Sequence, residues 1–129
     1  MIKKLENGYY VLPLGKLTDK RFAYNSMVDK LKERLSSDYP LHGHIGHPNN
    51  IESFFGRAIP DLVINSYDDV NNECHIKMID QKISDDTLKY CYLAPVLTYR
   101  HTDKGCEIER IITLDIIFDH ALVNREIQV

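Results

Sequence analysis

Two long apolar segments in the second half of the chain restrict its fold more than any other feature. The first runs from Tyr90 to His101 and the second from Glu107 to Phe118, and only Thr102-Asp103-Lys104-Gly105 separates them. Two strand-forming segments joined by so short a polar turn predict an antiparallel β-hairpin. The fold must therefore contain an antiparallel sheet, against which any helix has to pack.

One amphipathic helix is predicted in the first half, from about Ser26 to Ser36, with Asn25 or Ser26 as its N-cap. Four apolar residues recur there at intervals of four, three and four, which places them on one helical face. They are Tyr24, Val28, Leu31 and Leu35. The other predicted elements are strands at 9–14, 58–66 and 74–79, an extended piece at 41–45, and a helical turn at 84–89 that Ser84 caps. We expect an α+β fold in which one principal helix packs against an antiparallel sheet or a partly closed β-barrel.

The composition indicates a single intracellular domain spanning residues 1–129. Hydrophobic residues make up 43% of the 129, enough to bury a core without metal or disulfide support. The 19 acidic and 16 basic residues nearly cancel, so we expect neither a nucleic-acid partner nor an anionic membrane. Cys74, Cys91 and Cys106 have unrelated spacings, which favours reduced thiols over disulfides. The basic start leads into no apolar signal segment, and no apolar run approaches the roughly 20 residues of a spanning helix.

Three of the six histidines, His42, His44 and His47, lie within six residues of one another. If this piece is extended, His42 and His44 project to the same side. Three interpretations remain open. The three imidazoles, or two of them with a distant carboxylate, could bind zinc, copper, iron or nickel. Alternatively, His47 could be a general base held rigid by Pro48, or all three could be polar loop residues without chemical function.

The order of several patches along the chain resembles the prohead core proteases of tailed bacteriophages, which have a herpesvirus assemblin-like fold. In the first half these are Asp19-Lys20-Arg21-Phe22, the helix from Asn25 to Leu35, and Gly43-His44-Ile45-Gly46-His47-Pro48. In the second half the patches are residues 58–61, 92–100 and 111–117. The patch at 92–100 resembles the strand that carries the family's nucleophile, and the patch at 111–117 resembles the family's closing strand. The resemblance covers about residues 17–119 and implies that His47 occupies the position of the catalytic histidine.

The chain departs from the family at the nucleophile, because no serine follows Ser84. The family's serine position corresponds to Leu97 or Thr98. Leucine cannot attack a carbonyl, and Thr98 would serve only if its hydroxyl faced His47. Cys91 and Cys106 are the alternative nucleophiles in this region, unless they are small buried apolar residues.

Three aspartates, Asp61, Asp115 and Asp119, are candidates for the acid that orients a catalytic histidine. Asp115 lies inside an apolar segment, where an unpaired charge would be costly. We therefore expect it either to have a partner, for which Arg100 and Arg110 are candidates, or to point outward at an edge.

These features predict a phage protein of the virion or of capsid assembly that is catalytically inactive. It would bind an extended segment of a capsid, scaffold, portal or tail protein, or another copy of itself, without a cofactor. It would act in the host cytoplasm and be retained in the virion. One alternative is an active head-maturation endopeptidase using His47 with Thr98 or a cysteine. The other is a metal-binding protein using His42, His44 and His47.

Overall fold

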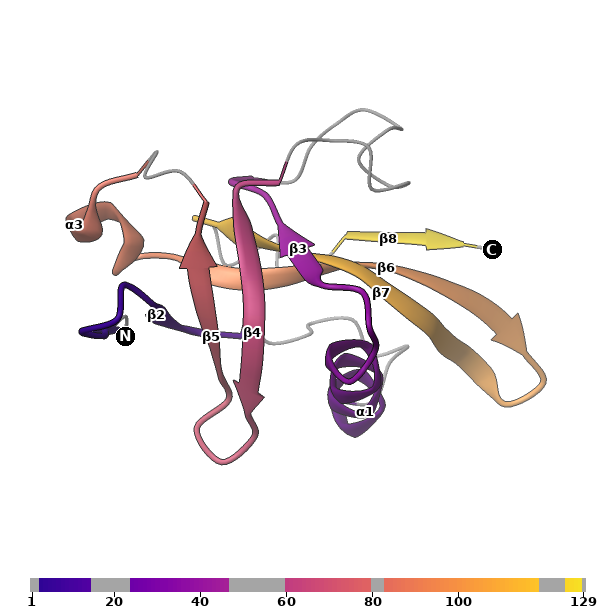
Figure 1. Ribbon diagram of the computed structural model, residues 1–129. Coiled ribbons are helices and arrows are strands. Elements are labelled where there is room, and N and C mark those ends of the chain that lie inside the picture. The colour runs from indigo at the N-terminus through magenta and orange to yellow at the C-terminus, as the bar shows by residue number, and fades with distance from the viewer. Residues whose placement is uncertain (1–2, 15–23, 47–59, 80–82, 119–124, 129) are drawn as a thin grey trace.

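The computed structural model describes residues 3–14, 24–46, 60–79, 83–118 and 125–128, and the side chains of these residues except 24, 25 and 125–128 (Figure 1). Strands and two helices make up most of the described chain. In chain order the elements are β1 (Lys3–Lys4), β2 (Tyr10–Pro13), α1 (Tyr24–Leu35), β3 (Leu41–Gly43), β4 (Leu62–Asp68), β5 (Glu73–Met78), α3 (Asp85–Leu88), β6 (Tyr92–Thr102), β7 (Gly105–Ile117) and β8 (Arg125–Gln128). The fold is α+β with mostly antiparallel strands, as the sequence predicts.

The described strands form two sheets. One has the order β1-β2-β5-β4-β3 and the other β7-β6-β8. Every neighbouring pair is antiparallel except β6 and β8, whose parallel pairing was not predicted. The sheets meet at two parallel bridges, Ile45 with Ile116 and Leu14 with Leu93. Over the described residues they do not close into a barrel.

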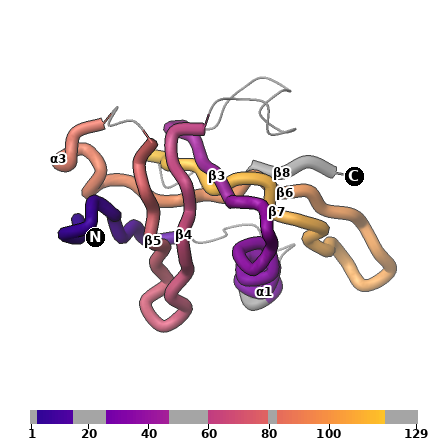
Figure 2. The backbone as a smooth tube through the Cα atoms, in the orientation of Figure 1, coloured from indigo at the N-terminus to yellow at the C-terminus, as the bar shows by residue number. Residues whose placement is uncertain are grey.

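The predicted hairpin is formed by β6 and β7, which are paired along their whole length. Its turn is shorter than expected, because Thr102 already pairs with Gly105 and only two residues lie between them. Gly105 has a φ of +115°, which glycine adopts without the strain of a side chain. Register shifts after Val96 and after Thr98 place two irregularities in the ladder. Beyond them the hairpin projects away from α1 and from the five-stranded sheet (Figures 1 and 2).

Helix α1 begins at Tyr24, so Asn25 and Ser26 lie inside the helix and the predicted N-cap is wrong. The apolar face is confirmed at Val28 and Leu31, which are buried. Met27, which the predicted stripe omitted, is also fully buried, because it lies one turn before Leu31 on the same side of the helix.

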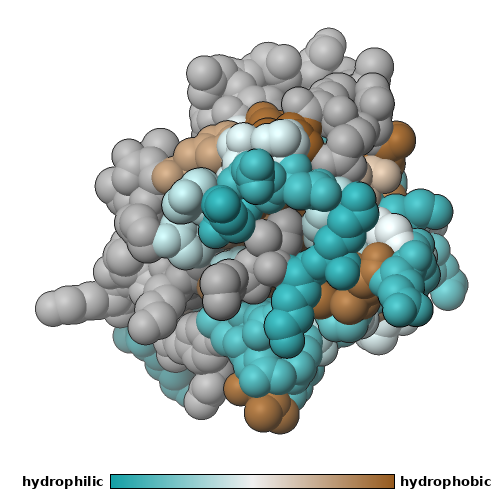
Figure 3. All heavy atoms as spheres, turned by 90° about the vertical axis from the view of Figure 1, so that its left-hand side faces the viewer, coloured by the Kyte–Doolittle hydropathy of each residue, from teal (hydrophilic) through white to brown (hydrophobic). Residues whose placement is uncertain are grey.

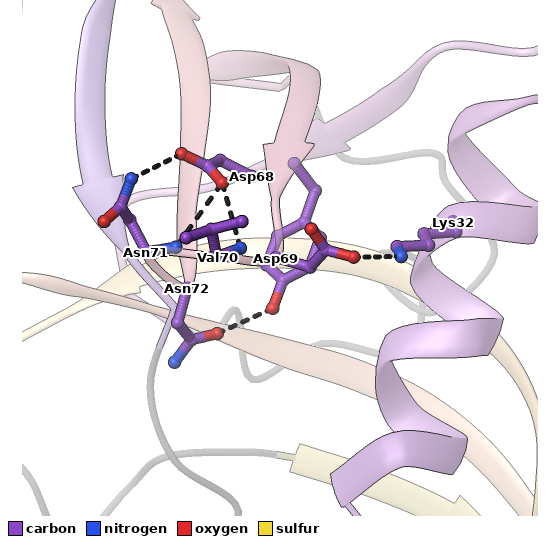
Figure 4. A network of polar contacts seen from close by, with 7 residues as sticks. Lys32, Asp68, Asp69, Val70, Asn71 and Asn72 are labelled. Carbon is purple, nitrogen blue, oxygen red and sulfur yellow. Dashed lines mark hydrogen bonds and ion pairs between the residues drawn. The ribbon is translucent and has the colours of Figure 1, made fainter.

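The loop between β4 and β5 is built by side chains that bond to their own backbone. Asp68 accepts hydrogen bonds from the backbone N–H and the side-chain amide of Asn71, and Asn72 takes a φ of 55°, which asparagine tolerates. An ion pair between Asp69 and Lys32 then connects this loop to α1 (Figure 4). The loop and the helix are therefore fixed to each other at the end of the five-stranded sheet that is lower in Figure 1.

Strand boundaries differ from the prediction where local bonds interrupt the extended chain. β4 begins at Leu62, and the predicted start at residue 58 lies outside the described residues. β6 begins at Tyr92 because the turn of α3 continues, with the Cys91 N–H donating to the Leu88 carbonyl. The predicted cap of α3 is confirmed, since the Ser84 side chain accepts from the Thr87 N–H.

One hydrophobic core joins both sheets and α1. Its largest fully buried side chains are Tyr10, Leu12, Met27, Leu31, Leu41, Leu62, Ile76, Leu88, Leu93, Leu97, Ile111 and Leu114. On the face at the left of Figure 1, most of the described residues are hydrophilic, with small separate hydrophobic areas between them (Figure 3). None of the described helices is long and apolar enough to cross a membrane.

Candidate functional site

The junction between β3 and β7 brings a histidine and an aspartate together in the protein interior. Asp115 is fully buried, and the His44 side chain is only 6% exposed. One carboxylate oxygen, Asp115 Oδ1, lies 3.1 Å from His44 Nδ1 and also accepts the backbone N–H of His44 at 2.9 Å. A carboxylate on Nδ1 fixes the orientation of an imidazole, as in the acid–histidine half of a catalytic triad.

Backbone bonds hold the chain after β3 against β7. The Ile116 N–H donates to the His44 carbonyl at 2.8 Å, and the Gly46 N–H donates to the Ile116 carbonyl at 2.7 Å. From β4's side, Asp61 Oδ2 accepts the Ile45 N–H at 2.8 Å. The extended piece predicted at 41–45 is therefore confirmed: His42 and Gly43 pair antiparallel with β4, and Ile45 forms a parallel bridge to β7.

Gly43 permits this close approach. A Cβ atom at this position would lie 1.8 Å from the Leu114 carbonyl oxygen and 2.9 Å from Leu62 Cδ1. The glycine in the predicted motif thus has a steric function, which is to let β3 cross the backbone of β7.

The predicted partner of Asp115 is wrong. Arg100 instead forms an ion pair with Glu109 on its own hairpin, at 2.7 Å. The sequence contained one indication that His44 could be this partner. A buried carboxylate needs hydrogen-bond donors, and His44 is a candidate donor in another strand segment. The strand order that joins β3 to β7 was the missing information.

The three predicted metal ligands do not form a cluster among the described residues. His42 is half-buried on β3, His44 binds Asp115, and His47 lies outside the described residues, as does Asp119. Within the described ranges no group of three potential ligands is close enough to hold a metal ion. Burial, and after it the positive charge of Arg34, lower the pKa of His42, so this imidazole is neutral at pH 7.

We expect acidification to destabilise the wild-type protein more than the His42→Gln variant. In the unfolded chain His42 binds a proton as the pH falls through about 6.5. In the folded protein its pKa is lower, so between these two values the unfolded state binds more protons and stability decreases with falling pH. Urea unfolding at pH 7.5 and at pH 5.5 measures this difference. The matched control is His75→Gln, a half-buried histidine on β5, which should behave like wild type. Equal acid sensitivity of the wild type and His42→Gln would contradict the assignment.

The strand that resembles the family's nucleophile strand carries no activated hydroxyl at the two predicted positions. Leu97 is fully buried in the core. Thr98 points to the opposite face of β6 and is 9% exposed, and its hydroxyl has no hydrogen-bond partner in the part of the chain that the structure describes.

The three cysteines have different environments. Burial raises the pKa of Cys74 to about 12 and that of Cys91 to about 11, which keeps both as thiols. Cys106 is half-buried near the end of the hairpin, with its Sγ 3.3 Å from Nδ1 of His101. No short pattern in the sequence pairs these two residues. The register of the two-residue turn, which places residue 101 opposite 106, is the signal that identifies them.

Comparison finds no family model that matches the chain, no similar curated protein and no similar solved structure.

Proposed function

We propose that this chain is a phage virion or capsid-assembly protein, with a prohead-protease-like fold, that binds an extended segment of a structural protein without cutting it. The resemblance of the ordered patches supports the phage origin. The α+β arrangement of a helix with mostly antiparallel strands is compatible with it. Folds alone do not fix function, so the proposal depends on the site.

The environment of Thr98 carries the proposal. A serine or threonine becomes a nucleophile when a base lies within hydrogen-bond distance, about 2.6–3.2 Å, of its hydroxyl. The buried Thr98 hydroxyl contacts no such base among the described residues, and the neighbouring Leu97 has no reactive group. A chain that keeps the family's pattern without its nucleophile can retain the binding of a peptide and lose its hydrolysis.

The outer edge of β7 is the place at which an extended segment would bind. β7 is an edge strand of its sheet, and its outer side pairs with described residues only near Ile116. Alternate N–H and C=O groups of an edge strand point outward, where another strand can pair with them. A groove of about 180 Å³ runs beside this edge, lined by Lys30 of α1 and by Arg100, Glu107, Ile108 and Glu109 of the hairpin. A segment with both acidic and basic side chains matches this lining.

The test is binding and cleavage of synthetic segments from the scaffold, capsid, portal and tail proteins of the virus that encodes the chain. We expect at least one segment to bind and none to be cut. The double variant Glu107→Lys with Arg110→Glu, which reverses two exposed charges on β7, should weaken binding about three- to tenfold. The control Asp86→Lys, on α3, should bind like wild type. Thr98→Val should leave binding unchanged and raise stability by about 1 kcal/mol, because it removes a buried unpaired hydroxyl.

Two results would contradict the proposal. The first is binding that the β7 variant leaves unchanged. The second is cleavage that disappears in His47→Ala, which would instead identify the active endopeptidase.

A further inference from the structure

A thiol and an imidazole lie in contact near the exposed end of the β6–β7 hairpin. Cys106 and His101 are directly opposite each other in the ladder, and Sγ is 3.3 Å from Nδ1. The Tyr99 ring meets the His101 ring edge-to-face, with centroids 5.7 Å apart and planes at 78°, and this contact orients the imidazole. The exposed histidine and the half-buried cysteine are both accessible from solvent, unlike Cys74 and Cys91.

We propose that Cys106 and His101 form a reactive thiol site that exchanges with a small zwitterionic disulfide of the glutathione class. His101 accepts the Cys106 proton as Sγ attacks one sulfur of the disulfide. The disulfide bond breaks, a mixed disulfide forms at Cys106, and the departing thiolate takes the proton from the imidazolium. The reaction consumes one disulfide and one thiol and yields one disulfide and one thiol, so it needs no other oxidant.

The exposed turn next to the pair carries one anion and one cation, Asp103 and Lys104. Lys104 matches a carboxylate of a glutathione-like disulfide, and Asp103 matches its ammonium group. The groove at Lys30 is separate from this site, because its lining residues Arg100 and Glu107 are the next pair in the ladder and point to the opposite face of the hairpin.

Cys74 and Cys91 provide internal controls within the same chain. A pKa raised from 9.0 to about 11, as at Cys91, lowers the thiolate fraction at neutral pH about a hundredfold. Cys106 is half-buried and contacts a base, whereas Cys74 and Cys91 are buried, so Cys106 should form the mixed disulfide far faster than either of them when the full chain is incubated with oxidised glutathione. Peptide mapping after an acid quench measures the rate at each cysteine.

The base function of His101 is tested by His101→Phe, which keeps a ring beside Tyr99 but cannot accept a proton. We expect the Cys106 rate to fall about tenfold or more, because the variant has no ring nitrogen to accept the thiol proton. His75→Phe is the matched control and should react like wild type. His101→Gln, a smaller polar change, should show the same loss if the phenylalanine disturbs the hairpin. Equal rates in wild type and in the His101 variants, or equal rates at all three cysteines, would overturn the proposal.

The class of reactant is tested separately with Lys104→Gln, which removes the cation of the turn next to the pair. This variant should slow exchange with oxidised glutathione severalfold and leave exchange with the neutral hydroxyethyl disulfide unchanged. An equal effect on both disulfides would exclude recognition by the charges of the turn. These readouts involve no phage protein, so their failure leaves the proposed binding function untouched.

Discussion

Replacing Asp115 with alanine should lower the free energy of unfolding by about 3 kcal/mol or more, because it leaves two buried donors without their acceptor at about 1–3 kcal/mol each. The carboxylate is fully buried and accepts hydrogen bonds from both the backbone N–H and the ring of His44. Without it, both donors remain in the interior without this acceptor. Urea unfolding, followed by far-UV circular dichroism at pH 7, measures the loss.

Two other variants distinguish the contribution of the His44–Asp115 pair to stability from the general effect of a substitution in β7. Asp115→Asn keeps an acceptor for the His44 N–H and should cost less, about 1–3 kcal/mol. Glu107→Ala removes an exposed carboxylate from the same strand and should change stability by less than about 0.5 kcal/mol. If Asp115→Ala were no more destabilising than Glu107→Ala, the pair would not hold β3 to β7.

Replacing Gly43 with alanine should cost about 3 kcal/mol or more and lower the melting temperature by about 10 °C. The added Cβ would lie 1.8 Å from the Leu114 carbonyl oxygen, which belongs to the backbone of β7. This oxygen cannot move aside like the end of a flexible side chain. The variant must therefore separate β3 from β7, where the histidine segment is fixed.

Gly8→Ala is the matched control for this substitution. Gly8 has a φ of +85°, but no atom lies within 4 Å of where its Cβ would be. Its replacement should cost only about 1 kcal/mol, the penalty of a left-handed backbone. Thermal unfolding of the two variants side by side distinguishes a clash from backbone strain, and equal losses would contradict the crowding at Gly43.

The local elements of this fold could be predicted because their signals are contained in short stretches of sequence. The turn between two strand-forming segments determined the β6–β7 hairpin, and the spacing of Val28 and Leu31 determined the buried side of α1. The parallel pairing of β8 and the arrangement of the strands in two sheets depend on contacts between distant segments. The periodicity of the sequence does not indicate such contacts.

The candidate site was only partly predictable for the same reason. From the sequence, an unpaired charge at Asp115 would be costly to bury, and His44 is a candidate metal ligand. The sequence did not indicate that these two residues contact each other. Their contact depends on β3 lying beside β7, which follows from packing rather than from local pattern. At Thr98 the pattern could not distinguish the two faces of β6, because a one-residue shift of register exchanges them.

The connection between the two sheets also has a consequence for how this chain folds. His44 and Asp115 are separated by 71 positions, whereas β6 and β7 are joined by a turn of two residues. Closing a long loop costs more entropy than closing a short one, and folding rates decrease as the mean sequence separation of contacts grows. The hairpin is therefore expected to form early, and the docking of β3 onto it late, which makes this junction the slow step of folding.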